Sequence, residues 1–257
     1  MDGYPLNLIL TVATASATIF LGFLPAKSIR AEFFARETLR AGLAWLLVAI
    51  VSPPAILHYP LIFALVCLAA SWQFRKDNIL NAKMWLSLAS GLGISIGVML
   101  ILAVTPKASG YPPGLSQPGE ALLLASIYLG GAVIGLAYVC LILNQNVSMN
   151  SGVTNNLVQR YAGLLLILAL VRAAALLVSF GAAPGYLGRQ WVALRSPAHG
   201  VSEAVTLFVL AVLVLPALAF YSKRATRLAS RVQPTRALVA ICLIGFMAEI
   251  LARLLVL

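Results

Sequence analysis

The sequence has 257 residues, of which 61% are hydrophobic and only 10% are charged, and its mean hydropathy is +0.98. These values exclude a soluble globular domain, because the apolar residues come in long continuous blocks that a polar surface cannot cover. The formal net charge of +11 does not indicate a nucleic-acid surface, since the basic residues lie in short segments between the apolar blocks. We therefore expect an integral membrane protein.

Eight apolar segments approach the length of a membrane-spanning helix, which is roughly 20 residues. In chain order they lie at 6–25, 41–57, 59–74, 84–105, 121–143, 161–181, 202–221 and 236–256. Ser52, Pro53 and Pro54 separate the second segment from the third, and a proline pair breaks a helix, so we expect a tight hairpin with His58 in its turn. The predicted fold class is all-α: one integral membrane domain, residues 1–257, forming a polytopic bundle of about eight transmembrane helices.

The basic residues predict the orientation of these helices. They follow the first, third and seventh segments: Lys27, Arg30, Arg36 and Arg40, then Arg75, Lys76 and Lys83, then Lys223, Arg224, Arg227, Arg231 and Arg236. Loops rich in lysine and arginine stay on the cytoplasmic side of a membrane. We therefore expect both the N-terminus and the C-terminus on the outer side of the inner membrane of a bacterium.

Small residues predict how the helices pack. Gly93 and Gly97 in the fourth segment, and Gly131 and Gly135 in the fifth, are each spaced four residues apart. This spacing forms a face on which another helix backbone can approach closely, so we expect helix contacts at all four positions. The polar run 144–146 is interpreted as an ordinary polar helix end.

Neither a metal site nor a haem site is expected from the cysteines and histidines. The cysteines lie singly in separate segments without CxxC spacing: Cys67, Cys140 and Cys242. His58 and His199 both fall in predicted outer loops or at helix ends, whereas a bis-histidine haem is held between facing helices. No HExxH motif or comparable ligand cluster is present.

Three ionisable residues lie deep in the predicted helices. At 1.5 Å per residue from the cytoplasmic side, Arg172 lies roughly 18 Å into the sixth segment and Glu249 roughly 20 Å into the eighth, with Arg253 one turn beyond. An isolated charge at this depth costs on the order of 2.5–3.5 kcal/mol, so partners are expected. We predict a triad of Arg172, Glu249 and Arg253, because an acid followed four residues later by a base is a favourable helical pair.

Further polar residues gather on the predicted outer side. His58 lies in the second hairpin, while His199 and Glu203 mark the start of the seventh segment, four residues apart and so on one helix face. With the triad they could frame an apolar pocket with a few convergent polar groups, as a small amphipathic ligand requires. Each group also has a structural interpretation: an interhelical clamp for the triad, a turn residue for His58 and a solvated loop residue for His199.

Both ends of the chain resemble one membrane-protein family. The ending MAEILARLLVL is similar to the last helix of the dimethyl sulfoxide reductase membrane anchor (DmsC) and polysulfide reductase NrfD-like family. The opening YPLNLILTVATASATIFLGF is similar to the family's first helix, RAE at 30–32 to its first inner loop, and ILHYP at 56–60 to its histidine-containing turn. The turn after His58 is shorter than the family's, and the third segment, LIFALVCLAASW, lacks a polar residue near its start.

The resemblance implies a membrane anchor subunit of a respiratory redox complex that binds quinol near the outer leaflet. Such a subunit carries no metal and passes electrons to an iron–sulfur subunit that serves a molybdenum enzyme, so it interacts with quinol without being an enzyme alone. His58 would then be the base on the quinol side, with Glu249 and Arg253 supporting the pocket. Histidine suits this role because its unperturbed pKa of about 6.5 lies near working pH.

Two alternatives to a quinol-binding anchor follow from the same residues. The departures around His58 favour a non-catalytic structural or assembly subunit of a membrane complex. A small-solute transporter would need polar groups near the midplane in both halves of the chain, which the sequence does not show.

Overall fold

The structure, a computed structural model, describes residues 4–26, 29–52, 54, 56–104, 117–147, 152–182, 206, 208–227 and 232–256. Its elements are α1 (Tyr4–Gly22), α2 (Ala31–Ile50), α3 (His58–Arg75), α4 (Ile79–Val104), α5 (Gln117–Asn146), α6 (Asn155–Ala182), the π-helical segment η2 (Val209–Val214), α9 (Leu215–Ala225) and α10 (Val232–Val256). All of them are helical, and no strand occurs among the described residues. The all-α part of the predicted fold class is therefore confirmed.

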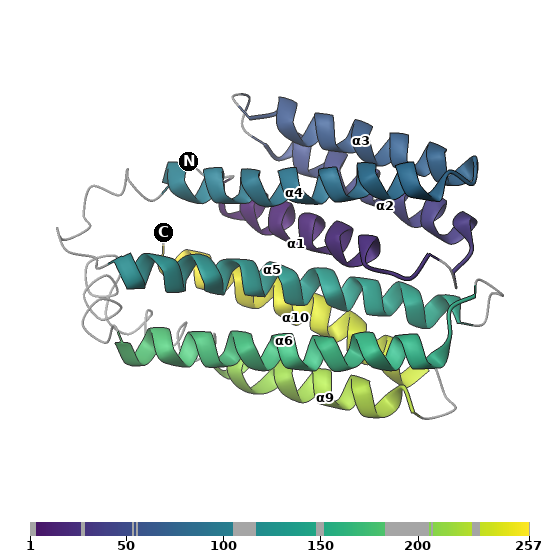
Figure 1. The fold of residues 1–257 in the computed structure, drawn as a ribbon. Helices are drawn as coiled ribbons and strands as arrows, with labels where there is room; N and C mark the ends of the chain where they lie inside the picture. The colour runs from purple at the N-terminus through teal and green to yellow at the C-terminus, as the bar shows by residue number, and fades with distance from the viewer. Residues whose placement is uncertain are drawn as a thin grey trace.

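The helices lie side by side and alternate in direction (Figure 1). The first and last helices bring both chain ends to one end of the bundle, here named the terminus end. The end at which α5 finishes and α6 begins is named the opposite end. Helices α3 and α4 form a hairpin because the connection between Arg75 and Ile79 is short.

Three helical segments within the described part of the chain are long and apolar enough to cross a membrane. They are Tyr128–Asn146, Asn155–Val178 and Val232–Leu251, and Leu6–Gly22 is apolar but shorter. These segments have the membrane character that the composition predicts.

Helix α1 links the two halves of the bundle. It packs against α4 and α2 in one half and against α5 in the other. Helix α3 packs against α2 and α4, and α10 and α6 pack against α5, with α9 against both of them (Figure 1). The close approach of α5 to α1 depends on glycine: a Cβ on Gly135 would lie 2.6 Å from the backbone nitrogen of Ala17, and one on Gly131 would overlap Val12. The predicted helix contact is therefore confirmed at both glycines.

Gly93 also lies in a helix contact, as predicted. A Cβ there would lie 2.9 Å from both the Ala15 Cβ and a ring carbon of Trp45, so α4, α1 and α2 meet at this glycine. Gly97 belongs to α4, but its surroundings lie outside the described part of the structure, so the predicted contact there stays a prediction.

The second helix differs from its predicted range of 41–57, because it begins at Ala31 and ends at Ile50. Residues 31–40 carry charges that suggested a loop, yet Phe33, Phe34 and Ala41 lie on one buried face at helical spacing. His58 also differs, since it is the first residue of α3 instead of a turn residue. Pro60 is compatible with this start because the first turn of a helix does not need its N–H.

The segment predicted at 202–221 is observed as η2 followed directly by α9, while 201–205 and 207 lie outside the described residues. Pro216 lies in the first turn of α9. It cannot donate a hydrogen bond to Val212, and its ring would crowd that carbonyl in a regular helix. The wider π-helical turns of η2 are a common way to accommodate such a break.

Candidate functional site: two buried carboxylates

Arg172 of α6 and Glu249 of α10 form an ion pair inside the bundle. Nη2 of Arg172 donates a hydrogen bond to Oε1 of Glu249, and the two residues are only 1% and 2% exposed. Each lies 17 residues after the first residue of its helix. Both helices begin at the opposite end (Figure 1), so the two side chains lie at the same depth, about 25 Å along the helix axis.

Helix α5 forms the wall behind the Glu249 carboxylate. A Cβ on Gly130 would overlap Oε1 and the carboxyl carbon of Glu249, so the carboxylate occupies the space that a side chain would otherwise fill. Gly130 is buried. The pair therefore fixes three helices relative to one another: α5, α6 and α10.

The surroundings of the pair are apolar. Leu176, one turn after Arg172, packs with Ala211 of η2 and with Ala248, the neighbour of Glu249. Nε and Nη1 of Arg172 are buried and have no hydrogen-bond partner among the described residues. In such surroundings the charges attract each other strongly, and neither can return to water without separating the helices.

The other residues of the predicted site are placed differently. Arg253 lies one turn beyond Glu249 on α10, but its side chain is outside the described side chains, and His199 and Glu203 are outside the described residues. His58 is exposed, with its ring 4.0 Å from that of Tyr59. Because α3 packs against α2 and α4, the structure does not bring His58 together with the Arg172–Glu249 pair.

A second buried carboxylate, which the sequence analysis missed, belongs to Glu37 of α2. It is 1% exposed, and two neighbouring arginines on the same helix neutralise it. Nε of Arg36 donates to its Oε1 at 2.9 Å, and Nη1 of Arg40 donates to both carboxylate oxygens at 3.0 and 3.1 Å. The sequence analysis used these two arginines only to predict the orientation of the helices in the membrane.

The Glu37 cluster is tied to α5 through Asn146. Nη2 of Arg36 donates to Oδ1 of Asn146, whose Nδ2 donates to the carbonyl of Ile142 at 2.7 Å. Nearby, Nδ2 of Asn144 donates to Oγ1 of Thr235 on α10 at 2.9 Å. The run 144–146 is therefore not an ordinary polar helix end, because Asn144 and Asn146 are buried and join α5 to α2 and α10.

The described residues contain no group of three histidine, cysteine or acidic side chains that could hold a metal ion. Cys67, Cys140 and Cys242 are free thiols. Both buried carboxylates are instead bound by arginine, which stays charged at any physiological pH. The arrangement thus supplies fixed interhelical links in place of a cluster of metal ligands.

No family model, curated protein or solved structure matches this chain. Its function is therefore inferred from its own geometry and from the resemblance at its two ends.

Proposed function

We propose that this chain is a membrane anchor, an integral subunit that holds a larger complex at the bilayer. In this proposal it crosses the inner membrane of a bacterium as a bundle of eight helices with both termini outside. The observation that carries the proposal is the buried Arg172–Glu249 pair against Gly130, which links three helices. A bundle whose buried charges are used to fix its helices suits a static support better than a carrier that must rearrange in each cycle.

The resemblance of the chain ends supports the class of partner. An iron–sulfur subunit and a molybdenum enzyme subunit are the partners that it implies for an anchor with this ending. Such partners would dock on parts of the bundle that face the aqueous phase, since interface cores are formed by surface residues that become desolvated on binding.

The proposal is tested by purifying the tagged chain from its native membrane in mild detergent, identifying the co-eluting proteins and recording a visible spectrum. We expect stoichiometric partners that include an iron–sulfur protein, whose cluster absorbs broadly in the visible range. The Glu249→Ala variant, which breaks the buried pair, should lose them, whereas Gly91→Ala, whose new methyl would meet no atom within 4 Å, should keep them.

Three other outcomes of this purification are informative. Elution of the wild-type chain alone would contradict the anchor role. Stoichiometric partners without a redox centre would retain the anchor but remove the redox complex, which leaves a structural or assembly subunit. Haem absorption that follows the chain itself would contradict an anchor without its own redox centre.

A second candidate function is quinol binding at His58, and the observation that favours it is the accessibility of this side chain. His58 is exposed, and exposed Leu57 and Tyr59 flank it, so a base is presented beside apolar surface. A quinol that is oxidised there releases two electrons and two protons. The electrons would pass to the iron–sulfur partner, one proton would go to the His58 imidazole and the other to the outer aqueous phase.

This candidate is tested on the intact complex with His58→Ala and His58→Gln. We expect both variants to weaken binding of a quinol-site inhibitor at least ~10-fold, because a charge-assisted or strong hydrogen bond is removed. Arg75→Gln, at the other end of α3, is the matched control. Unchanged inhibitor affinity together with unchanged quinol oxidation would remove His58 from the mechanism without affecting the anchor proposal.

A further inference from the structure

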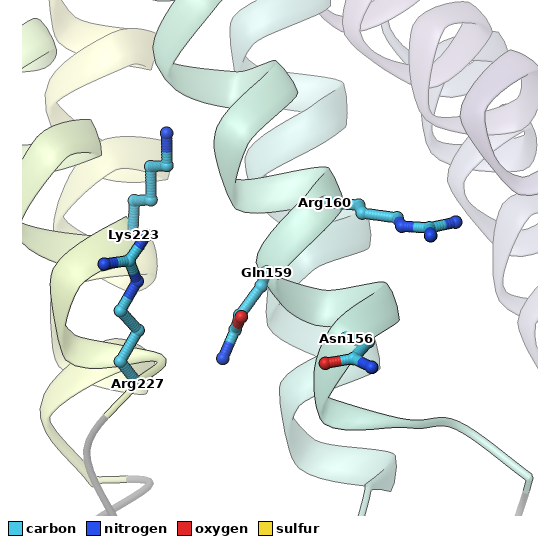
Figure 2. A pocket seen from close by; sticks show the side chains of 5 residues that line it. All are labelled: Asn156, Gln159, Arg160, Lys223 and Arg227. Carbon is cyan, nitrogen blue, oxygen red and sulfur yellow. The ribbon is translucent and has the colours of Figure 1, made fainter.

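A cavity of about 260 Å³ lies between α6 and α9 at the opposite end of the bundle. Asn156, Gln159 and Arg160 of α6 line it together with Lys223 of α9 and Arg227, which lies two residues after the end of α9 (Figure 2). We propose that this cavity binds a phosphate group, supplied either by the head group of an anionic lipid or by a free phosphate anion. The proposal depends neither on the anchor role nor on quinol binding.

The lining side chains come from both helices. Lys223 lies in the last turn of α9 and Arg227 in the turn that follows it, and Gln159 reaches from α6 toward them (Figure 2). Nζ of Lys223 lies 3.9 Å from the position of a Cβ on Gly163, so the lysine crosses the surface of α6 where glycine leaves room. Arg160 points away from α9 in Figure 2 and contributes its charge at the edge of the cavity.

The cavity carries positive charge that no described acidic residue neutralises. Neither α6 nor α9 contains an acidic residue, and none of the three cations forms an ion pair with a described residue. Two basic residues outside the cavity are instead engaged: Arg40 bonds to Glu37, and Nζ of Lys76 lies 3.6 Å from the centre of the Trp72 ring. Basic residues that only orient the helices in the membrane do not need to line one cavity, whereas an anion-binding site requires this.

The chemistry of the lining matches phosphate. Guanidinium and ammonium groups donate strong charge-assisted hydrogen bonds to phosphate oxygens, and the two amides supply further N–H donors. The cavity also lies beside the first two turns of α6, where the helix dipole favours an anion. Its volume of about 260 Å³ is several times the roughly 30 Å³ that a water molecule occupies in the liquid, so there is room for a phosphate group.

The position of the cavity makes a lipid head group a natural source. Asn156 is the second residue of α6, and α6 is one of the helices with the length and hydropathy of a membrane span. A site within the first turns of such a helix lies near the head-group level of a bilayer. Basic pockets between membrane helices on that level bind anionic head groups.

The test compares the full-length chain with Lys223→Gln/Arg227→Gln, which removes two charges from the cavity. Arg75→Gln/Lys76→Gln is the control, since it removes two charges at the same end of the bundle but outside the cavity. Each protein is placed in phosphatidylcholine nanodiscs containing a minor fraction of cardiolipin, and native mass spectrometry measures the cardiolipin retained. Calorimetric titration with inorganic phosphate, on protein in detergent without anionic lipid, measures the free anion.

We expect wild type and control to bind alike and the cavity variant to bind at least ~10-fold more weakly, because charged hydrogen bonds are lost. Cardiolipin retention without phosphate binding identifies a lipid head group, and phosphate binding without lipid retention identifies a free anion. Equal binding by the folded cavity variant and the control, in both measurements, overturns the proposal. Should the double variant unfold, the single Arg227→Gln, at an exposed side chain, provides the same comparison.

Discussion

Glu37 and Glu249 are equally buried, yet the protein neutralises the two carboxylates in different ways. Glu249 accepts a hydrogen bond from Arg172 on another helix, and Arg172 is itself only 1% exposed. Glu37 is held by Arg36 and Arg40 on its own helix, whose side chains are 43% and 47% exposed. Burial of a carboxylate alone therefore does not determine how much it contributes to stability, because the solvent exposure of its counter-ion also matters.

The two arrangements respond differently to damage. Removing either partner of the Arg172–Glu249 pair takes the ion-pair bond away from a buried charge, and water does not replace that bond. Loss of an arginine beside Glu37 leaves the second arginine in place, and solvent can reach the guanidinium groups. The first cluster should therefore behave as a buried ion pair and the second as a partly solvated network.

The largest expected effect is that of Arg172→Ala or Glu249→Ala. Each should lower the free energy of unfolding by about 3–5 kcal/mol, because the buried charge that remains loses its ion-pair partner. The measurement is chemical unfolding in detergent micelles, with helix content followed by circular dichroism. The double variant Arg172→Met/Glu249→Leu replaces both charges with apolar groups of similar length and should recover most of the loss. A double variant as unstable as the sum of the singles would show that the pair itself is not the cause.

The next largest effect is expected for Gly130→Ala, which places a methyl group where the Glu249 carboxylate lies. Overpacking of this kind should cost about 1–3 kcal/mol. Gly91→Ala is the matched control, because no atom lies within 4 Å of its new methyl and alanine favours helix. In a Glu249→Ala background the cost of Gly130→Ala should shrink. If Gly130→Ala lowers the free energy of unfolding equally in that background, contact with the Glu249 carboxylate is not the cause of the loss.

Much of the fold could be predicted from the sequence because the helices are marked by long apolar blocks. Helices α3, α5 and α10 overlap closely with the predicted segments 59–74, 121–143 and 236–256. Helix α2 was predicted to begin ten residues too late, since its first three turns combine charges with a narrow apolar face. A mean hydropathy over these turns hides the apolar face, because the charged residues lower the mean. The helical spacing of Phe33, Phe34 and Ala41 reveals that face.

The candidate site could be predicted only where depth along a helix was informative. Arg172 and Glu249 are far from the ends of their helices, so the sequence alone indicated that they need partners, and the structure pairs them. Glu37 was missed because Arg36 and Arg40 beside it have the pattern of a solvated loop. The separation of His58 from the pair could not be predicted. His58 belongs to α3, which packs against α2 and α4, and the order of helices along the chain does not determine which helices become neighbours.

A smaller effect is expected for Glu37→Gln, which keeps one oxygen acceptor for Arg36 and Arg40 but removes the charge. The free energy of unfolding should fall by about 1 kcal/mol, because the ion pairs with the two arginines are lost and one acceptor oxygen is replaced by an amide NH2 group, which cannot accept from arginine. Glu249→Gln, measured under the same conditions, is the matched comparison and should cost clearly more. If the two amide variants lose equal stability, the exposure of the counter-ion does not distinguish the two carboxylates.

The smallest effect should separate the two arginines beside Glu37. Arg40→Gln removes one partly exposed ion pair, which is worth about 0.2–1 kcal/mol and weakens with added salt. Arg36→Gln removes a similar pair and also the hydrogen bond to Asn146 of α5, so it should cost about 1 kcal/mol more. A double-mutant cycle with Asn146→Ala isolates that extra term, because Arg36 should couple to Asn146 and Arg40 should not. Equal coupling of both arginines would mean that the cluster does not hold α2 to α5 through this one bond.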